Sequence, residues 1–462
     1  MTGAGETLPG SPRWSPPFGG APTPRRRRPR QIRSSTRHSL VASSTNLLNG
    51  LLNAALLALS ARHGQTDEIG AYVAVTAALS LVSIVVAGGS PLLYISGDAE
   101  QRRAVRSQWV FVTLPCMVLG TVVIGSLYSR SGYEWPTMLA IALVTIGNHQ
   151  ADFQLGDLTR DLRFVSTAVA VCGCKVPALV MVALGEPLSS ALLTAAVIQF
   201  VAAEAFLGRR SWLRPRLLVE LSPRRAFSAF RMNRHLFTYS IAEYWGGRMT
   251  TVLLSLLVTP SVMGAFGAVF SVYQAQTSVL TAALRVSLVG RVRRRQGIDN
   301  ANSGRQGELV AIAGAVTMTV VSVVAAPWIV GDLLRLPAHG PAVWLILLAV
   351  ALPCMTIVRA VTLNQIGDAS YRQATRIMVL NAVLITPLAL AAVPLAGPTG
   401  AATATLAAEV LTGAVLGLAL VRRQGRLSAW FFGPASGSTA AVPAVSAPQQ
   451  MISASPPGGI RR

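Results

Sequence analysis

Twelve apolar runs, each long enough to cross a bilayer as one helix, take up most of this 462-residue chain. A membrane-spanning helix needs about 20 consecutive apolar residues. Hydrophobic residues make up 52% of the sequence and charged residues 13%, against about 25% charged residues in a soluble domain. The pattern therefore predicts an all-α, polytopic membrane protein. The predicted spans are 39–60, 70–96, 107–128, 137–158, 164–185, 187–207, 235–257, 261–284, 309–331, 341–365, 375–396 and 399–421.

The arginines give an independent test of this span count. The cytoplasmic loops of membrane proteins collect Lys and Arg. If the amino terminus is cytoplasmic, 34 of the 39 arginines fall in or beside inside segments, and three fall in outside loops. A miscounted span would place arginine-rich segments on both sides of the membrane. We therefore expect a multi-pass protein of the cytoplasmic membrane with both termini in the cytoplasm, and this also explains the net charge of +22.

A short phrase occurs twice, as GAYVAV at 70–75 and as GAFGAV at 264–269. Chance is one explanation in a chain this rich in Ala, Val and Gly. Each copy, however, opens the second span of a six-span half, and AAE occurs in both final spans, at 202–204 and 407–409. Because the halves share one orientation, a duplication would be related by an axis along the membrane normal. We favour two pseudo-symmetric six-helix lobes.

The predicted organisation has five parts. A basic arm and a Pro/Ser/Ala-rich tail, both typical of disorder, flank two lobes joined by a basic cytoplasmic loop. The parts are the arm 1–38, the N-lobe 39–207, the inter-lobe loop 208–234, the C-lobe 235–425 and the tail 426–462.

Several classes of site are not expected. Lys175 is the single lysine, and its CGCKVP context lacks the glycine frame of a phosphate-binding P-loop. The four cysteines lie in apolar runs without the companions of a metal site. Topology accounts for the basic arm, so nucleic acid is not an expected partner. Neither a cofactor nor a metal is expected, and use of Arg over Lys is typical of a GC-rich bacterial genome.

Three stretches resemble one family of membrane transporters. They are EIGAY at 68–72, VMGAFGAV at 262–269 and GPTGAATATLAAEV at 397–410. They are similar to the polysaccharide (lipid-linked oligosaccharide) flippase branch of the multidrug/oligosaccharidyl-lipid/polysaccharide exporter superfamily. The resemblance covers about residues 39–425. It implies a MATE-like fold of two lobes around a V-shaped cavity, and a substrate carrying a diphosphate and sugars on a polyprenyl tail.

Arg248 lies near the middle of span 235–257, in YWGGRMTT. A charged residue at that depth costs about 2.5–3.5 kcal/mol on insertion scales, so it needs a reason to be there. A guanidinium facing a cavity can bind diphosphate oxygens in bidentate fashion. The alternative is a buried ion pair with Glu243, Glu409 or another carboxylate.

Among the other charged residues inside predicted spans are Glu409, Glu204, Lys175 and Arg359. Glu409 is either a protonatable group that couples transport to an ion gradient or the counter-ion of Arg248. Glu204 is a further candidate for ion coupling, or its carboxylate reaches water at the inner end. Lys175 either contributes to a substrate cavity or is paired. Arg359 is expected to extend its head to the cytoplasmic interface.

Asn46, Asn49 and Asn53 are spaced by three and four residues, which places them on one face of the first span. The three amides either bind a neighbouring helix or line a wet cavity, where they match sugar hydroxyls. Gly50 and the pair Gly246–Gly247 are predicted hinges, where cavity-lining helices bend or pack closely.

The predicted function is translocation of a polyprenyl-diphosphate-linked oligosaccharide by alternating access, for polysaccharide biosynthesis. The expected partners are this substrate, membrane lipids and enzymes of polysaccharide synthesis. The first alternative is a multidrug/cation antiporter of the same fold; the first span has no carboxylate, which weighs against it. A membrane glycosyltransferase or polymerase is less favoured, because the outer loops are short and contain one acidic pair, Asp67–Glu68. No catalytic residue is predicted.

Overall fold

The computed structural model describes residues 29–87, 99–160, 163–207, 221–232, 234–295, 303–337, 339–367 and 370–422. These residues are helical apart from short connections and contain no strand. Among them, seven helical stretches are long and apolar enough to cross a membrane. The predicted all-α, multi-pass class is therefore confirmed.

The first half of the chain contributes eight α-helices and one π-helical segment to the described structure. They are α1 (Pro29–Arg62), α2 (Thr66–Ala87), α4 (Ala99–Gln108), η1 (Trp109–Thr113), α5 (Leu114–Ser129), α6 (Trp135–Arg160), α7 (Phe164–Gly173), α8 (Lys175–Ala183) and α9 (Leu188–Leu207).

The rest of the described chain forms six further α-helices and a second π-helical segment. They are α11 (Pro223–Met232), α12 (Arg234–Leu257), α13 (Pro260–Arg295), α14 (Ser303–Trp328), η3 (Ile329–Leu333), α15 (His339–Gly367) and α16 (Tyr371–Val421).

The helices differ from the predicted spans in several places. The first helix begins at Pro29, inside the expected arm, since proline is favoured at the first position of a helix. The predicted span 164–185 is interrupted at Cys174. Pro177 has no N–H to donate to the carbonyl of Gly173, so the helical ladder loses a bond there. The expected loop 208–234 contains the short helix α11.

The long element α16 contains two of the predicted spans. Gly397 has φ 54° and ψ −129°, and the chain reverses there. A positive φ favours glycine, and Pro398 cannot continue the preceding helix. After the reversal, a Cβ on Gly400 would lie 2.0 Å from the carbonyl oxygen of Ala392. The two arms of α16 are thus in backbone contact just past the turn.

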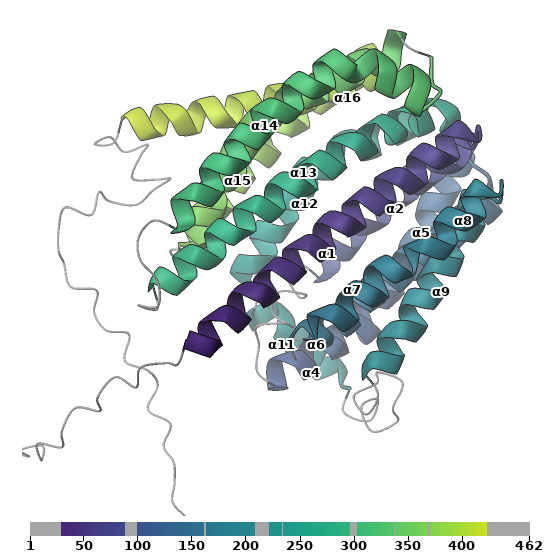
Figure 1. Cartoon of the computed structure of the whole chain (residues 1–462). Helices are drawn as coiled ribbons and strands as arrows, with labels where there is room; N and C mark the ends of the chain where they lie inside the picture. Colours follow the sequence, from purple (N-terminus) through teal and green to yellow (C-terminus); the bar gives the residue numbers. More distant parts are fainter. Residues whose placement is uncertain are drawn as a thin grey trace, which may run out of the picture.

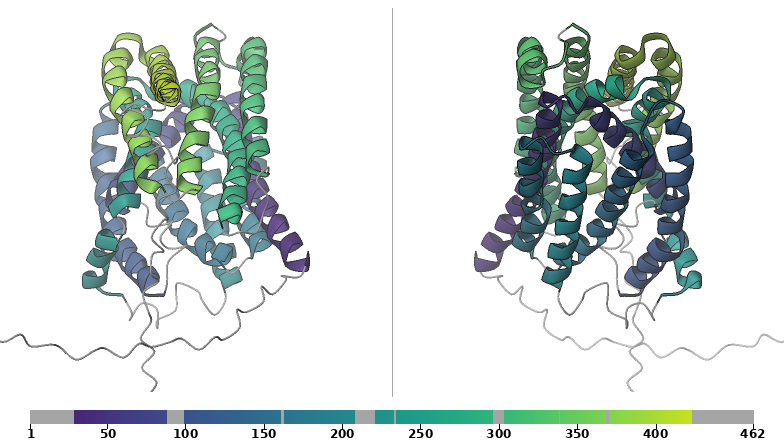
Figure 2. Two further views of the ribbon diagram at one scale, coloured as in Figure 1. Left: turned by 90° about the vertical axis from the view of Figure 1, so that its left-hand side faces the viewer. Right: turned by 90° about the vertical axis from the view of Figure 1, so that its right-hand side faces the viewer.

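The helices run side by side as an upright bundle (Figure 2). In the first half, α6 packs against α2 and α9, and α1 packs against α7 and α8. In the second half, α16 packs against α12 and α15, and α14 against α13 and α15. Contacts of α13 with α1 and α2, and of α12 with α2, join the halves; α1 and α13 lie next to one another in Figure 1.

The two copies of the repeated phrase face each other in this junction. A Cβ on Gly70 would lie 2.0 Å from the carbonyl oxygen of Pro260, and one on Gly264 would lie 1.7 Å from that of Thr66. Either position therefore excludes a side chain, since atoms cannot approach so closely. The glycines let α2 and α13 cross in backbone contact. Nearby, the Tyr128 hydroxyl lies 2.7 Å from the Ser255 hydroxyl and links α5 to α12.

Candidate functional site

A cavity of about 420 Å³ lies within the second half of the chain, among α12, α13, α15 and α16. Its volume falls in the usual range of small-molecule sites. Its lining combines charged, amide and hydroxyl groups with a few apolar side chains. The lining residues are Glu243, Tyr244, Gly246, Gly247, Arg248, Phe270, Tyr273, Gln274, Thr277, Ser278, Thr281, Met355, Val358, Arg359, Met378, Asn381, Thr405 and Glu409.

Helix α12 supplies the most polar side of this cavity. Glycines at 246 and 247 keep the wall free of side chains beside Arg248. A Cβ on Gly246 would lie 2.6 Å from the Asn381 Oδ1, so this glycine lets α16 approach. A Cβ on Gly247 would meet nothing within 4 Å, so that position opens onto free space.

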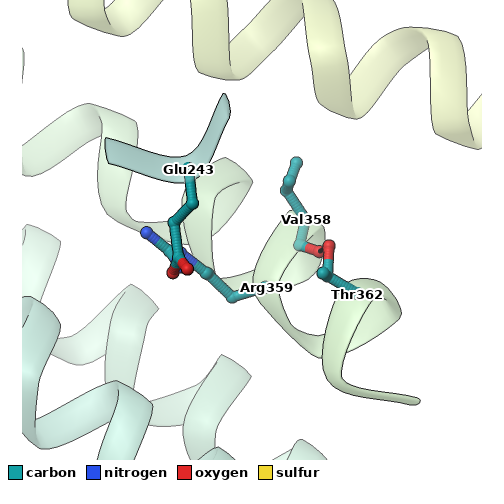
Figure 3. Close-up of polar contacts among 4 residues, drawn as sticks. All are labelled: Glu243, Val358, Arg359 and Thr362. Atoms are coloured by element: carbon teal, nitrogen blue, oxygen red, sulfur yellow. Dashed lines mark hydrogen bonds and ion pairs between the residues drawn. The ribbon is translucent and has the colours of Figure 1, made fainter. Parts of the chain in front are cut away.

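Glu243 and Arg359 form an ion pair between α12 and α15, in which Arg359 Nη1 donates to Glu243 Oε1 (Figure 3). The two side chains are 24% and 30% exposed, respectively, so the pair is shielded but not sealed from water. Our expectation that Arg359 extends to the cytoplasmic interface is wrong. The reason is the carboxylate of Glu243, which offers this guanidinium a charge partner inside the protein.

Arg248 is half-buried and forms no hydrogen bond or ion pair with any other described residue. The ionisable groups near enough to interact with its charge are Tyr244 on its own helix and Tyr72 on α2. Tyr72 belongs to the repeated phrase of the first half, so Arg248 lies where the two halves meet. Glu243, the carboxylate nearest in sequence on α12, is bound to Arg359. Arg248 therefore presents an unneutralised guanidinium to the cavity.

Glu409 lies on the second arm of α16 and lines the same cavity. Arg359 and Asn381 are its charged and polar neighbours. Its Oε2 atom is buried and has no hydrogen-bond partner in the described part of the chain. Asn381 is also held by a 3.2 Å bond to the Thr412 hydroxyl. Glu409 is thus a second carboxylate on the cavity wall, with Arg359 as its charged neighbour.

Our inspection of the sequence missed a polar stripe on α13. Gln274, Thr277, Ser278 and Thr281 all line the cavity. They recur at intervals of three and four residues, which places them on one face of a helix. That spacing was visible in the sequence, in the run QAQTSVLTAAL. Because these side chains are uncharged, they do not stand out from an apolar run as Arg248 and Glu409 do.

The remaining predicted residues lie outside the cavity wall. Lys175 is buried in the first half at the start of α8, 8% exposed. Asn49 and Asn53 are half-buried on α1, and the Asn49 Oδ1 has no hydrogen-bond partner among the described residues. The side chain of Asn46 lies outside the described residues. Glu204 accepts a hydrogen bond from the Gln154 side-chain amide.

At Gly50, α1 closely approaches the cavity wall. A Cβ at this position would lie 3.2 Å from the Cβ of Ser278, which lines the cavity. Helix α1 therefore packs against Ser278 of the polar stripe of α13. Of the predicted site residues, the structure brings Arg248, Glu243, Glu409, Gly246 and Gly247 together in one cavity.

Within the described ranges, no group of three or more His, Cys, Asp or Glu side chains is placed to hold a metal ion. The four cysteines are all free thiols. The polar groups of the cavity are instead suited to ion pairing and hydrogen bonding.

The sequence matches no family model and no curated protein. The fold, by contrast, is similar to solved structures of the MOP superfamily. An inward-facing multidrug resistance MATE transporter aligns with a TM-score of 0.56 at 12% identity, over 85% of this chain and 98% of the other. The lipid II flippase MurJ, in an inward closed conformation, aligns with a TM-score of 0.55 at 11% identity, over 84% and 87%.

A eukaryotic MATE transporter aligns with a TM-score of 0.51 at 14% identity, over 87% of this chain and 98% of the other. At these identities the similarity establishes the fold and nothing finer. The chain has the fold of the MATE transporters and of MurJ, as the resemblance in its helix motifs implied.

Proposed function

We propose that this chain is a transporter that moves a polyprenyl-diphosphate-linked oligosaccharide across the cytoplasmic membrane by alternating access, for polysaccharide biosynthesis. The observation that carries this proposal is that the half-buried guanidinium of Arg248 lines the cavity and has no charge partner among the described residues. A charge at membrane depth without a partner is costly, so it indicates a function. An anionic substrate supplies the missing partner.

The chemistry of the cavity matches the two polar parts of such a substrate. The guanidinium fork of Arg248 fits two oxygens of a diphosphate. Gln274, Thr277, Ser278 and Thr281 supply amide and hydroxyl groups that both donate and accept hydrogen bonds, as sugar hydroxyls require. The lipid tail would stay in the bilayer, so the cavity needs to hold only the headgroup.

The proposal also assigns roles to the other predicted residues. The substrate would also be bound by residues of the first half when that half moves. These residues are Asn46, Asn49, Asn53 and Lys175. Glu409, Glu243 and Glu204 are the candidates for ion coupling or for counter-ions. Gly246 and Gly247 would allow the cavity-lining helix α12 to bend, and Gly50 would do the same for α1, which packs against the cavity wall. Both termini and the basic loops would lie in the cytoplasm, beside the enzymes that make the substrate.

A multidrug/cation antiporter of the same fold is the second candidate. Two carboxylates, Glu243 and Glu409, line the same cavity, and the fold also aligns with MATE multidrug transporters. Against this reading, Arg359 already neutralises Glu243, while Arg248 would repel a cationic drug at close range. We therefore favour the anionic substrate.

A deletion strain tests the proposal. Surface polysaccharide and intracellular polyprenyl-diphosphate oligosaccharide are quantified together, with and without the gene restored. We expect surface glycan to fall and the lipid-linked intermediate to accumulate in the deletion strain. Unchanged glycans with increased accumulation of cationic dyes would favour the antiporter instead.

A further inference from the structure

The short helix α11 and helix α4 lie together at one end of the bundle (Figure 1). Helix α4 continues through η1 into α5, and this stretch, Glu100–Ser129, is a candidate membrane span. Helix α11 packs against α4 and η1, and a single residue separates it from α12. The N–H of Ser222, just before α11, donates to the Ser107 hydroxyl at 3.2 Å. Helix α11 is therefore held beside the end of a membrane span, where the polar surface of the bilayer begins.

Helix α11 buries one side and leaves an aromatic ring on another. Ala226 is fully buried, whereas the next side chain, Phe227, is 69% exposed. Arg224 is exposed as well, and its spacing of three residues makes it a surface neighbour of Phe227. Arg224 forms no hydrogen bond or ion pair with another described residue. We call these two side chains the α11 surface.

The helices α4 and α11 carry an excess of positive charge. Their described side chains include five arginines and one carboxylate, that of Glu100. On α4, the Nη1 atom of Arg102 is buried and has no hydrogen-bond partner in the described part of the chain. By sequence, the preceding segments 88–98 and 208–220 add four arginines and two acidic residues. Their charges therefore do not cancel the excess.

An exposed phenyl ring beside an arginine is typical of a helix that lies at a membrane surface. The ring enters the boundary between headgroups and acyl chains, and the guanidinium stays among the headgroups. The phosphate of an anionic phospholipid accepts charge-assisted hydrogen bonds from guanidinium groups. Its net negative charge also attracts a basic segment, which a zwitterionic lipid does not do.

We propose that the α11 surface, Arg224 and Phe227, together with the neighbouring arginines of α4, binds anionic phospholipid. The headgroup contacts the guanidinium groups, and the acyl chains cover the ring of Phe227. This proposal does not rest on the proposed transport function, because it concerns the lipid around the protein and not the substrate in the cavity.

Fluorescence quenching by brominated lipids tests which lipid covers this surface. Phe227→Trp places an indole at the exposed position, and its signal is the difference from the wild type, which contains eight tryptophans. One copy of the full chain is assembled in each nanodisc of phosphatidylcholine, with an increasing mole fraction of phosphatidylglycerol brominated on its acyl chains. Brominated phosphatidylcholine is the reference. We expect half-maximal quenching at a lower mole fraction of the anionic lipid than of the reference.

Charge variants in the Phe227→Trp chain test the role of Arg224. Since a basic residue near an anionic surface contributes to lipid attraction, Arg224→Gln should raise the mole fraction of anionic lipid at half-maximal quenching about fivefold. Arg224→Lys keeps the charge and should keep most of the preference. Arg62→Gln is the matched control, since Arg62 is exposed at the end of α1, and it should change nothing. Sodium chloride should weaken the preference, because exposed charges are screened.

Equal quenching by the two brominated lipids would overturn the proposal, since the surface would then have no preference for negative charge. An indole quenched by neither lipid would also overturn it, because protein and not lipid would then cover Phe227. The same holds if Arg224→Gln and Arg62→Gln had equal effects, which would indicate a response to net charge alone. None of these measurements requires transport. A chain that moves no lipid-linked substrate would therefore contradict the proposed function and leave the quenching result to decide the lipid site.

Discussion

Glu243 on α12 is bound to Arg359 on α15 (Figure 3). Arg248, five residues further along α12, has no carboxylate partner among the described residues. The cavity wall thus carries two arginines, of which one is neutralised. Because Arg359 takes up the carboxylate, Arg248 stays available to an anion.

The ion pair should contribute to stability as a unit. We expect Glu243→Gln and Arg359→Leu each to lower the melting temperature of the purified protein, because each leaves a partly buried charge without its partner. A hydrogen bond to a charged group is worth about 1.5–3 kcal/mol. In the double variant the loss should be smaller than the sum of the two single losses. Additive losses in this double-mutant cycle would show that the two residues do not interact.

The glycine crossing of α2 and α13 predicts a sharp steric effect. An added methyl at Gly70 or Gly264 would lie within 2.0 Å of a backbone oxygen, and overpacking of this kind costs about 1–3 kcal/mol or more. Gly70→Ala and Gly264→Ala should therefore lower the melting temperature. Gly417→Ala is the control, since a Cβ there meets nothing within 4 Å, and it should be neutral or slightly stabilising. If all three variants behaved alike, the two helices would not be in backbone contact.

The hydroxyl contact between Tyr128 and Ser255 predicts a modest, specific effect. Both side chains are buried, and Ser255 also donates to the Val252 carbonyl at 2.7 Å. Tyr128→Phe removes one bond between the halves and should cost about 0.5–1.5 kcal/mol. Combined with Ser255→Ala, it should cost little more, since the shared bond is already lost. A much larger effect of the double variant in thermal unfolding would argue against a shared bond.

The helical class and the approximate positions of most helices were predictable from the sequence, because apolar length and arginine distribution are strong signals. The sequence also pointed to the glycine phrases, although not to their contact with each other. That contact depends on the crossing of α2 and α13, and no local pattern specifies where helices cross.

The site was predictable in part. Arg248, Glu243 and Glu409 stood out because charges inside apolar runs are rare, and the structure places all three in one cavity. Their pairing was not predictable. Arg359 lies 116 positions from Glu243, and local spacing cannot choose among distant partners. The polar stripe on α13 has a helical period, but uncharged polar residues in an apolar run are a weaker signal of a site than charged ones.

The Arg248 guanidinium is the central claim, and binding by the purified protein in nanodiscs tests it most directly. The ligand is a short-chain polyprenyl-diphosphate disaccharide, and the variants are Arg248→Ala, Arg248→Lys and Arg130→Ala. Arg130 is exposed at the end of α5 and serves as the control. Truncating one partner of a hydrogen-bonded charge pair costs about 2–5 kcal/mol. We therefore predict that Arg248→Ala weakens binding about 30-fold or more, that Arg248→Lys weakens it less, and that Arg130→Ala leaves it unchanged. Equal affinity of the wild type and Arg248→Ala, or tighter binding of a cationic dye that Arg248→Ala improves further, would contradict the account.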